Sequence, residues 1–134
     1  MFLFILLCML FFHIVDDFYL QGILAKMKQK SWWKEQTDNQ MYQHDWLPAM
    51  IAHGISWSFM MMLPCNVYLL IHKPYAIYPI GLLFVANVLL HCYIDHHKCN
   101  KHWLNLMTDQ CLHMLQIGLT FFAFIMFVVI NITM

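Results

Sequence analysis

The 134-residue chain contains few charged residues, no arginine and no net charge. Only 10% of its residues are charged, whereas an ordinary soluble domain is roughly one-quarter charged. Hydrophobic residues make up 62% of the chain, more than a soluble fold of this length could bury. We therefore expect a single integral membrane domain over residues 1–134. The lack of a basic field excludes nucleic acid as a partner.

The cysteines and glycines form no chemical motif. The five cysteines are odd in number and contain no C-x-x-C pair, so they do not predict a disulfide framework. The four glycines are isolated, which leaves no phosphate-binding loop, and no nucleophilic serine or cysteine arrangement is present. The first apolar stretch lacks a basic n-region and a small-residue cleavage site, so we interpret it as a retained span.

The sequence contains several long apolar stretches. A bilayer core requires about 20 mostly apolar residues per helix. Four stretches meet this requirement, at roughly residues 2–25, 47–71, 78–98 and 103–132, and residues 26–46 form a polar loop. The predicted fold class is an all-α integral membrane protein, a bundle of four transmembrane helices.

The lysines predict the orientation of the bundle. Six of the seven lie in the first and third connections and one in the second: Lys26, Lys28, Lys30, Lys34, Lys98 and Lys101 against Lys73. By the positive-inside rule, loop 26–46 faces the cytoplasm and both termini lie on the non-cytoplasmic side of the inner (cytoplasmic) membrane. Tryptophans among the loop lysines favour contact with lipid headgroups.

Ionisable residues recur inside these apolar stretches. Each costs about 2.5–3.5 kcal/mol on insertion scales, so several in one small protein require an explanation. Three pairs are spaced four residues apart, which places both members on one helix face: His13 with Asp17, His91 with Asp95, and Asp109 with His113. The second stretch adds His53.

These residues also lie at one depth. Asp17 is nine residues from Lys26, and His91 is seven residues from Lys98. His53 is seven residues inside the second span, counted from Trp46, and Asp109 is eight residues from Lys101. At about 1.5 Å per residue, all four levels agree within a few ångströms. A single pair could be a buried contact that fixes helix packing, but three pairs at one level predict a convergent site.

Imidazoles and carboxylates that converge in a helical bundle form a ligand set for divalent metals. We predict zinc as the first choice, with manganese or iron as alternatives, and one or two ions. The predicted ligands are His13, Asp17, His91, Asp95, Asp109 and His113. His53 is predicted to be a ligand or a proton shuttle, and Lys98 to stabilise developing negative charge, so these two residues are the catalytic candidates.

The same residues resemble a known family. His13-x-x-x-Asp17-Phe18-x-Leu20-Gln21, His91-x-x-x-Asp95-x-x-Lys98 and Asp109-Gln110-x-x-His113 resemble motifs of small bacterial and phage membrane proteins grouped as domain of unknown function 3307. The resemblance implies a multi-span membrane protein. It also suggests a phage source and a loose similarity of pattern to membrane-bound metal-dependent hydrolases.

Two functions follow as hypotheses. The first is a membrane-embedded metal-dependent hydrolase that acts on an amphiphilic, lipid-like substrate from the cytoplasmic leaflet. The alternative is a non-enzymatic phage or bacterial membrane effector, acting on a host membrane protein, or a small proton or ion conduit that uses the buried His and Asp residues. Small residues such as Gly54, Ser56 and Ser58 allow helix packing within one chain or in an oligomer.

Overall fold

The computed structural model describes residues 1–72 and 77–133, with side chains for residues 1–72 and 80–130. Over these ranges the regular elements are all helices, which confirms the predicted all-α chain. They are α1 (Phe2–Ile14), the π-helix η1 (Val15–Leu20), α2 (Leu24–Met27), α3 (Lys30–Gln36), the 3₁₀ turn η2 (Gln40–Tyr42), α4 (Trp46–His72), α5 (Ile77–Cys99) and α6 (Leu106–Thr133). The predicted break around Lys73 lies outside the described residues.

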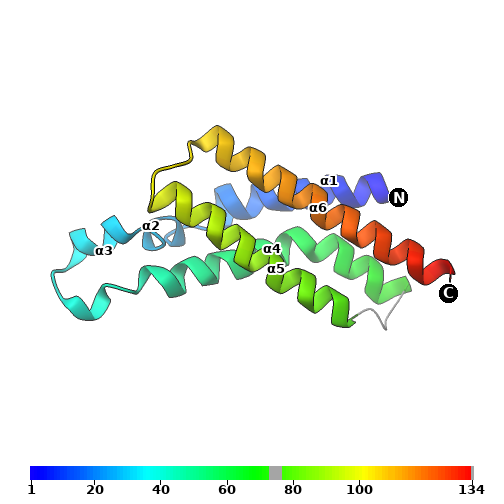
Figure 1. Ribbon diagram of the computed structural model, residues 1–134, viewed down its shortest axis with the longest axis horizontal. Coiled ribbons are helices and arrows are strands. Elements are labelled where there is room, and N and C mark those ends of the chain that lie inside the picture. The colour runs from blue at the N-terminus through cyan, green and yellow to red at the C-terminus, as the bar shows by residue number, and fades with distance from the viewer. Residues whose placement is uncertain (73–76, 134) are drawn as a thin grey trace.

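The long helices form one elongated bundle (Figure 1). α4 packs against α1, α5 and α6, and α5 also packs against α6. Both chain termini lie at one end of the bundle, and α2 and α3 lie at the other (Figure 1). The predicted stretches 47–71, 78–98 and 103–132 agree with α4, α5 and α6 to within three residues at each end. The arrangement brings the C-terminal half of α5 beside the N-terminal halves of α4 and α6.

The ionisable side chains of the long helices lie inside this bundle, and many large apolar side chains lie on its surface. His53 and His113 are completely buried, whereas Leu3 is 69% exposed, Leu82 77% and Phe122 64%. A surface of this kind suits lipid rather than water. Within the described residues, three segments are long and apolar enough to cross a membrane: Phe2–Leu20, Gln40–His72 and Leu106–Ile130. α5 is 23 residues long, but its last three turns are rich in histidine and charge.

The first apolar stretch is not the single continuous helix that the sequence predicted over residues 2–25. α1 passes into the wider turns of η1, where the Gln21 N–H donates to the Asp16 carbonyl five residues earlier, at 3.0 Å. Gly22 then adopts a φ of +46°, a conformation that glycine reaches without strain, and interrupts the helix before α2. Asp16 and Asp17 are both buried in η1. π-helical turns of this kind are frequent at functional sites.

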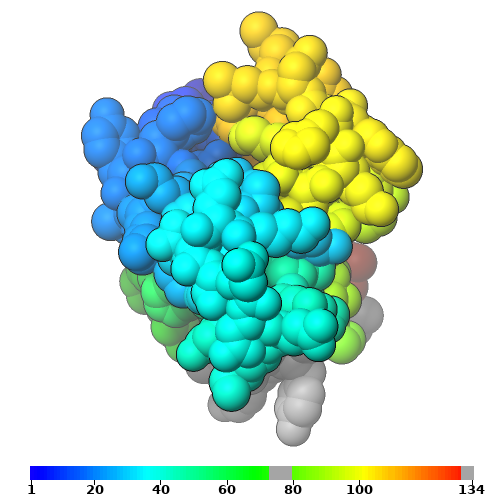
Figure 2. All heavy atoms as spheres, turned by 90° about the vertical axis from the view of Figure 1, so that its left-hand side faces the viewer, coloured from blue at the N-terminus to red at the C-terminus, as the bar shows by residue number. Residues whose placement is uncertain are grey.

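The predicted loop 26–46 is folded over the end of the bundle. Figure 2 looks at this end and shows the cyan segment that carries α3 lying across it. The Asn100 side chain at the end of α5 donates to the Lys28 carbonyl at 3.0 Å and accepts from the Lys30 N–H at 2.7 Å. The Trp33 indole N–H donates to the Met27 carbonyl at 2.7 Å. The two Asn100 bonds hold the start of the loop against the end of α5, and the Trp33 bond holds the loop to itself.

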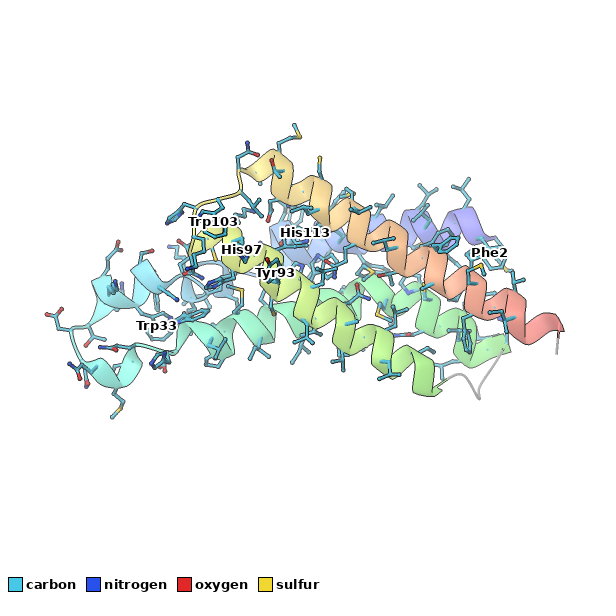
Figure 3. All side chains as sticks on the ribbon, viewed as in Figure 1. Phe2, Trp33, Tyr93, His97, Trp103 and His113 are labelled. Carbon is cyan, nitrogen blue, oxygen red and sulfur yellow. The ribbon has the colours of Figure 1, made fainter. Side chains whose placement is uncertain are left out.

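The bundle interior changes character along its length. Near the termini it is apolar and rich in methionine, with Met9, Met61 and Met62 buried. Next comes a polar layer, in which Gln116 and Thr120 of α6 each donate to the Asn87 side-chain oxygen of α5 at 2.9 Å. The ionisable residues lie beyond this layer, towards the α2–α3 end. Figure 3 shows Phe2 near the termini and His113 between the helices, nearer the opposite end.

Candidate metal centre

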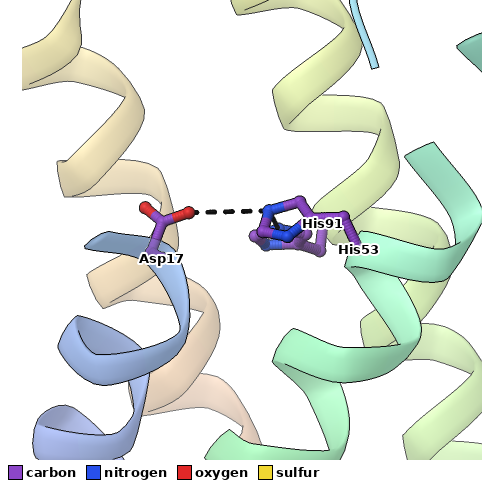
Figure 4. Close-up of side chains that lie close together, drawn as sticks. All are labelled: Asp17, His53 and His91. Carbon is purple, nitrogen blue, oxygen red and sulfur yellow. Dashed lines mark hydrogen bonds and ion pairs between the residues drawn. The ribbon is translucent and has the colours of Figure 1, made fainter. Parts of the chain in front are cut away.

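His53 of α4 is the centre of a dense group of ionisable side chains. Its Nε2 atom lies 3.1 Å from His91 Nε2, 3.3 Å from Asp95 Oδ2 and 3.6 Å from Asp17 Oδ1. His91 Nε2 and Asp95 Oδ2, one turn apart on α5, are separated by 3.7 Å. Figure 4 shows Asp17 of η1 facing the two imidazoles from across the bundle. Segments distant in sequence therefore bring ligand-type atoms of Asp17, His91 and Asp95 within 3.6 Å of His53 Nε2.

His113 of α6 is the centre of a second group beside the first. Its Nε2 atom lies 3.5 Å from Asp109 Oδ1 and 3.4 Å from Asp95 Oδ1. Neither ring nitrogen of His113 has a hydrogen-bond partner within the described part of the chain, although the residue is completely buried. Asp109 Oδ1 is also buried without such a partner. Unsatisfied buried polar atoms are rare in folded proteins and are consistent with an ion that would complete their bonding.

Three overlapping groups in the described residues have ligand atoms close enough for one ion, within 4.8 Å of one another. They are Asp17–His53–His91, His91–Asp95–His113 and Asp17–Asp109–His113. Each pair of groups shares one residue, which is His91, His113 or Asp17. The three groups therefore link six side chains into a closed ring. Imidazole nitrogens and carboxylate oxygens are ligands for zinc, manganese and iron, so the buried cluster could hold a metal ion of this class. We call these six residues the His–Asp ring.

Two lysines neutralise part of the negative charge. Lys28 Nζ donates to Asp95 Oδ2 at 2.5 Å and is buried with it. Lys98 Nζ donates to Asp109 Oδ2 at 2.5 Å, and its side chain is 32% exposed. With Asp16 included, four buried carboxylates meet two ammonium groups. If all four are ionised and the imidazoles are neutral, two negative charges remain, which equals the charge of one divalent cation.

His13 has a different place from the one that the sequence predicted. Its Nδ1 atom accepts from the Trp57 indole N–H at 2.8 Å, so its Nε2–H can donate to the Gln110 side-chain oxygen at 3.2 Å. Both ring nitrogens are therefore engaged, and His13 belongs to none of the three groups close enough for an ion. Trp57 also stacks on His91 with ring centroids 4.2 Å apart. His13 thus lies behind the ring and supports it through Trp57 and Gln110.

Asp16 also lies behind the ring. Its Oδ1 atom accepts from the Ser56 hydroxyl at 2.6 Å, and its Oδ2 atom faces His53 Nδ1 at 3.9 Å. At 3.9 Å these two atoms are too far apart for a hydrogen bond, so Asp16 supplies negative charge near His53 and does not fix its imidazole through a hydrogen bond. The π-helical turn buries Asp16 and Asp17 together, so consecutive residues contact opposite sides of His53.

The structure brings all the predicted site residues into or against one cluster. Five of the six predicted ligands belong to the ring, His53 joins them, and Lys98 bonds to Asp109 from its edge. Sequence reasoning missed Lys28 and Gln110. Lys28 lies in the predicted cytoplasmic loop, and nothing in its local pattern indicates a fold back into the bundle. Gln110 follows Asp109 directly, and its place in the D-Q-x-x-H pattern was the available signal.

The Gln110 amide connects the predicted ligands to one another. Its Nε2 atom donates to Asp17 Oδ2 at 3.0 Å and to Asp109 Oδ2 at 3.1 Å, while its oxygen faces His13. One side chain therefore positions two carboxylates of the ring and the imidazole behind it.

Comparisons with protein-family models, with curated proteins and with solved structures found no match to this chain. The resemblance to the phage and bacterial family therefore stays a prediction from the motifs.

Proposed function

We propose that this chain is a four-span membrane protein whose His–Asp ring binds a divalent metal ion, with zinc the first choice, and that the loaded protein hydrolyses an amphiphilic ester. The observation that carries the proposal is the spacing of ligand atoms around His53. Zinc bonds of about 2.0–2.1 Å in a tetrahedral site place neighbouring ligand atoms about 3.3–3.4 Å apart. The four measured separations, 3.1, 3.3, 3.6 and 3.7 Å, lie around this value.

The membrane arrangement rests on the surface of α5 and on the exposed lysines. α5 has Leu82, Leu89 and Tyr93 more than 60% exposed, so it presents an apolar face like those of the three segments named above. We assign it as the fourth span. Lys28 and Lys98 are withdrawn into ion pairs, but four lysines remain exposed at the α2–α3 end: Lys26, Lys30, Lys34 and Lys101. They support a cytoplasmic location for this end and a non-cytoplasmic location for both termini.

An apolar groove beside the polar layer supports an amphiphilic substrate. A cavity of about 390 Å³ lies between α4, α5 and α6, and its lining includes Leu69, Leu83 and Phe124. The cavity extends to Thr120, whose hydroxyl donates to the Asn87 side-chain oxygen. Asn87 lies one helical turn before His91 on α5. Cavities of this size hold small ligands in many proteins. A hydrocarbon chain in the groove would direct a polar head towards the ring.

Catalysis in this proposal divides between the ion and the protein. A bound divalent ion supplies Lewis acidity and lowers the pKa of a water ligand. Lys98, at the partly exposed edge of the ring, binds the negative charge that develops on the ester as water attacks. His53 acts as a ligand, and the Asp16 carboxylate lies on the far side of its ring, with Oδ2 3.9 Å from His53 Nδ1.

Metal analysis of the purified full chain tests the proposal. After reconstitution with Zn²⁺, the wild type should retain at least one ion per chain, and His91→Gln, which removes a member of two ligand groups, should bind fewer ions than the wild type. His44→Gln is the matched control because His44 is exposed on the folded loop. Absence of zinc from the wild type would refute the metal site. Bound zinc without hydrolysis of inner-membrane phospholipids or simple phosphoesters would refute the enzymatic part.

The polar layer favours one alternative function. Asn87, Gln116 and Thr120 continue the polar interior from the ring towards the termini, as a proton or ion pathway would require. Flux measurements on proteoliposomes distinguish the two functions. Conductance that Asn87→Leu abolishes would support the conduit, whereas an impermeable, hydrolytically active protein would exclude it.

A further inference from the structure

The ring contains two ligand sets, and a single carboxylate faces both. Asp95 Oδ2 lies 3.3 Å from His53 Nε2 and 3.7 Å from His91 Nε2. The other oxygen of the same carboxylate, Oδ1, lies 3.4 Å from His113 Nε2. The two oxygens of Asp95 therefore point at different imidazoles, as those of a bridging carboxylate do.

Asp17 is a second carboxylate common to both sets. Its Oδ1 atom lies 3.6 Å from His53 Nε2, on the side of the first set. It also forms a group with Asp109 and His113 whose ligand atoms lie within 4.8 Å of one another. Asp17 and Asp95 come from opposite sides of the bundle, from η1 and α5, so the two sets share ligands on both sides.

From this geometry we infer that the ring binds two divalent ions bridged by Asp17 and Asp95, an inference that rests on the proposed metal function. His53 and His91 complete the first ion's ligands, and Asp109 and His113 complete the second's. Ions that share bridging ligands lie about 3.5–4 Å apart in two-metal hydrolytic sites. Such a pair stabilises both the attacking and the leaving oxygen of a displacement, which a single ion does less completely.

The second set is already oriented for an ion. Lys98 and Gln110 both donate to Asp109 Oδ2, so Asp109 Oδ1 is left without a hydrogen bond and faces His113 at 3.5 Å. The measured separations in this set, 3.4 and 3.5 Å, match the edge of about 3.3–3.4 Å expected for a tetrahedral site. Lys98 neutralises the outer oxygen without occupying the inner one.

The charge of a two-ion centre indicates the substrate class. One divalent ion neutralises the excess of the four carboxylates over Lys28 and Lys98, whereas two ions leave two positive charges in a buried site. A buried charge of this size requires anionic ligands. A hydroxide and an anionic phosphoryl group supply them, so the substrate is a phosphoester rather than a neutral carboxylic ester.

Metal stoichiometry of the full chain in detergent micelles tests the inference. The wild type should saturate at two ions of Zn²⁺ per chain, and His53→Gln and Asp109→Asn, each altering one set, should each saturate at one. His44→Gln and Asp38→Asn, at exposed loop positions, should retain two. Saturation of the wild type at one ion would overturn the two-ion centre and leave the metal proposal standing. Binding of no ion would overturn both.

Manganese loading of the wild type is a second test, and it does not depend on whether a substituted variant folds. Two Mn²⁺ ions bridged by carboxylates give an exchange-coupled electron paramagnetic resonance spectrum, and separate ions give the six-line spectrum of isolated Mn²⁺. A coupled spectrum supports the bridge, and a six-line spectrum at saturation overturns it. Inorganic phosphate should change the coupled spectrum. A spectrum that millimolar phosphate leaves unchanged would overturn the assignment of a phosphoryl substrate.

Discussion

α4 and α5 approach each other closely at Gly54, beside the proposed ligand His53. A Cβ atom at this position would lie 2.6 Å from Cys92 Sγ and 3.3 Å from the Val88 carbonyl oxygen. Ordinary van der Waals contact begins at 3.4 Å, so the thiol must move by about 0.8 Å, the difference between 3.4 and 2.6 Å. The thiol can rotate, with loss of its 3.4 Å contact to the Met50 carbonyl, but the backbone carbonyl of Val88 cannot. Gly54→Ala must therefore separate the two helices slightly.

We predict that Gly54→Ala lowers the free energy of unfolding by about 1–3 kcal/mol, the usual cost of overpacking. It should also weaken zinc binding by about 10–100-fold, as changes behind metal ligands do. The reason is that His53 and His91 are the sequence neighbours of Gly54 and Cys92, and metal sites tolerate ligand shifts of only about 0.2 Å. Unfolding of the metal-free protein in mixed detergent micelles and competition with a zinc chelator measure the two effects.

Gly118→Ala in α6 is the matched control. A Cβ atom there meets nothing within 4 Å, so the substitution should be neutral or stabilise the helix by up to about 1 kcal/mol. The double variant Gly54→Ala/Cys92→Ala removes the thiol and should recover part of the lost stability. Equal behaviour of Gly54→Ala and Gly118→Ala would refute the close approach of α4 and α5, and with it the short separation of the two imidazoles.

Four further substitutions concern residues around the ring. Gln110→Ala, which frees two carboxylates, should weaken zinc binding by about 10–100-fold without changing the number of ions, as chelator competition will measure. Lys28→Met should destabilise the metal-free protein by about 3–5 kcal/mol because it leaves the buried Asp95 carboxylate without its ammonium partner, with only imidazoles beside it, and zinc should restore its thermal stability. Lys98→Met should cost less, since water reaches that lysine, and equal losses in melting experiments would contradict the burial difference. Trp57→Phe should abolish most of the fluorescence change on loading with Co²⁺, whereas Trp103→Phe, at an exposed position, should retain it.

Much of the cluster could be predicted because its causes are local. Helical periodicity places residues four apart on one face, and counting from a lysine or from Trp46 at the end of each apolar stretch predicts how far along the bundle each residue lies. Together they predicted that Asp17, His53, His91 and Asp109 lie at one depth, and the distances between these side chains agree. The ends of α4, α5 and α6 were predictable for the same reason, since apolar length and turn residues are properties of a short segment.

Spacing could not predict that His53 belongs to the ring and that His13 lies outside it. His13 has the same four-residue spacing to a carboxylate as the true ring members, but its nitrogens are taken by Trp57 and Gln110, which lie 44 and 97 residues away in the chain. His53 has no carboxylate one turn away on α4, and its partners come entirely from η1 and α5. Spacing along one helix shows which residues can face a site and does not show which neighbours occupy their polar atoms.

The sequence by itself determined the helical class, the apolar stretches and the level at which the ionisable residues meet, because hydrophobic length and helical period are local quantities. Only the tertiary structure decided which atoms form the ring. The π-helical turn that buries Asp16 and Asp17 together, and the return of Lys28 to Asp95 across 67 residues, depend on contacts between segments distant in the chain. Once buried, a charged group is stable only beside a partner, and which partner it finds is set by the packing of the whole bundle.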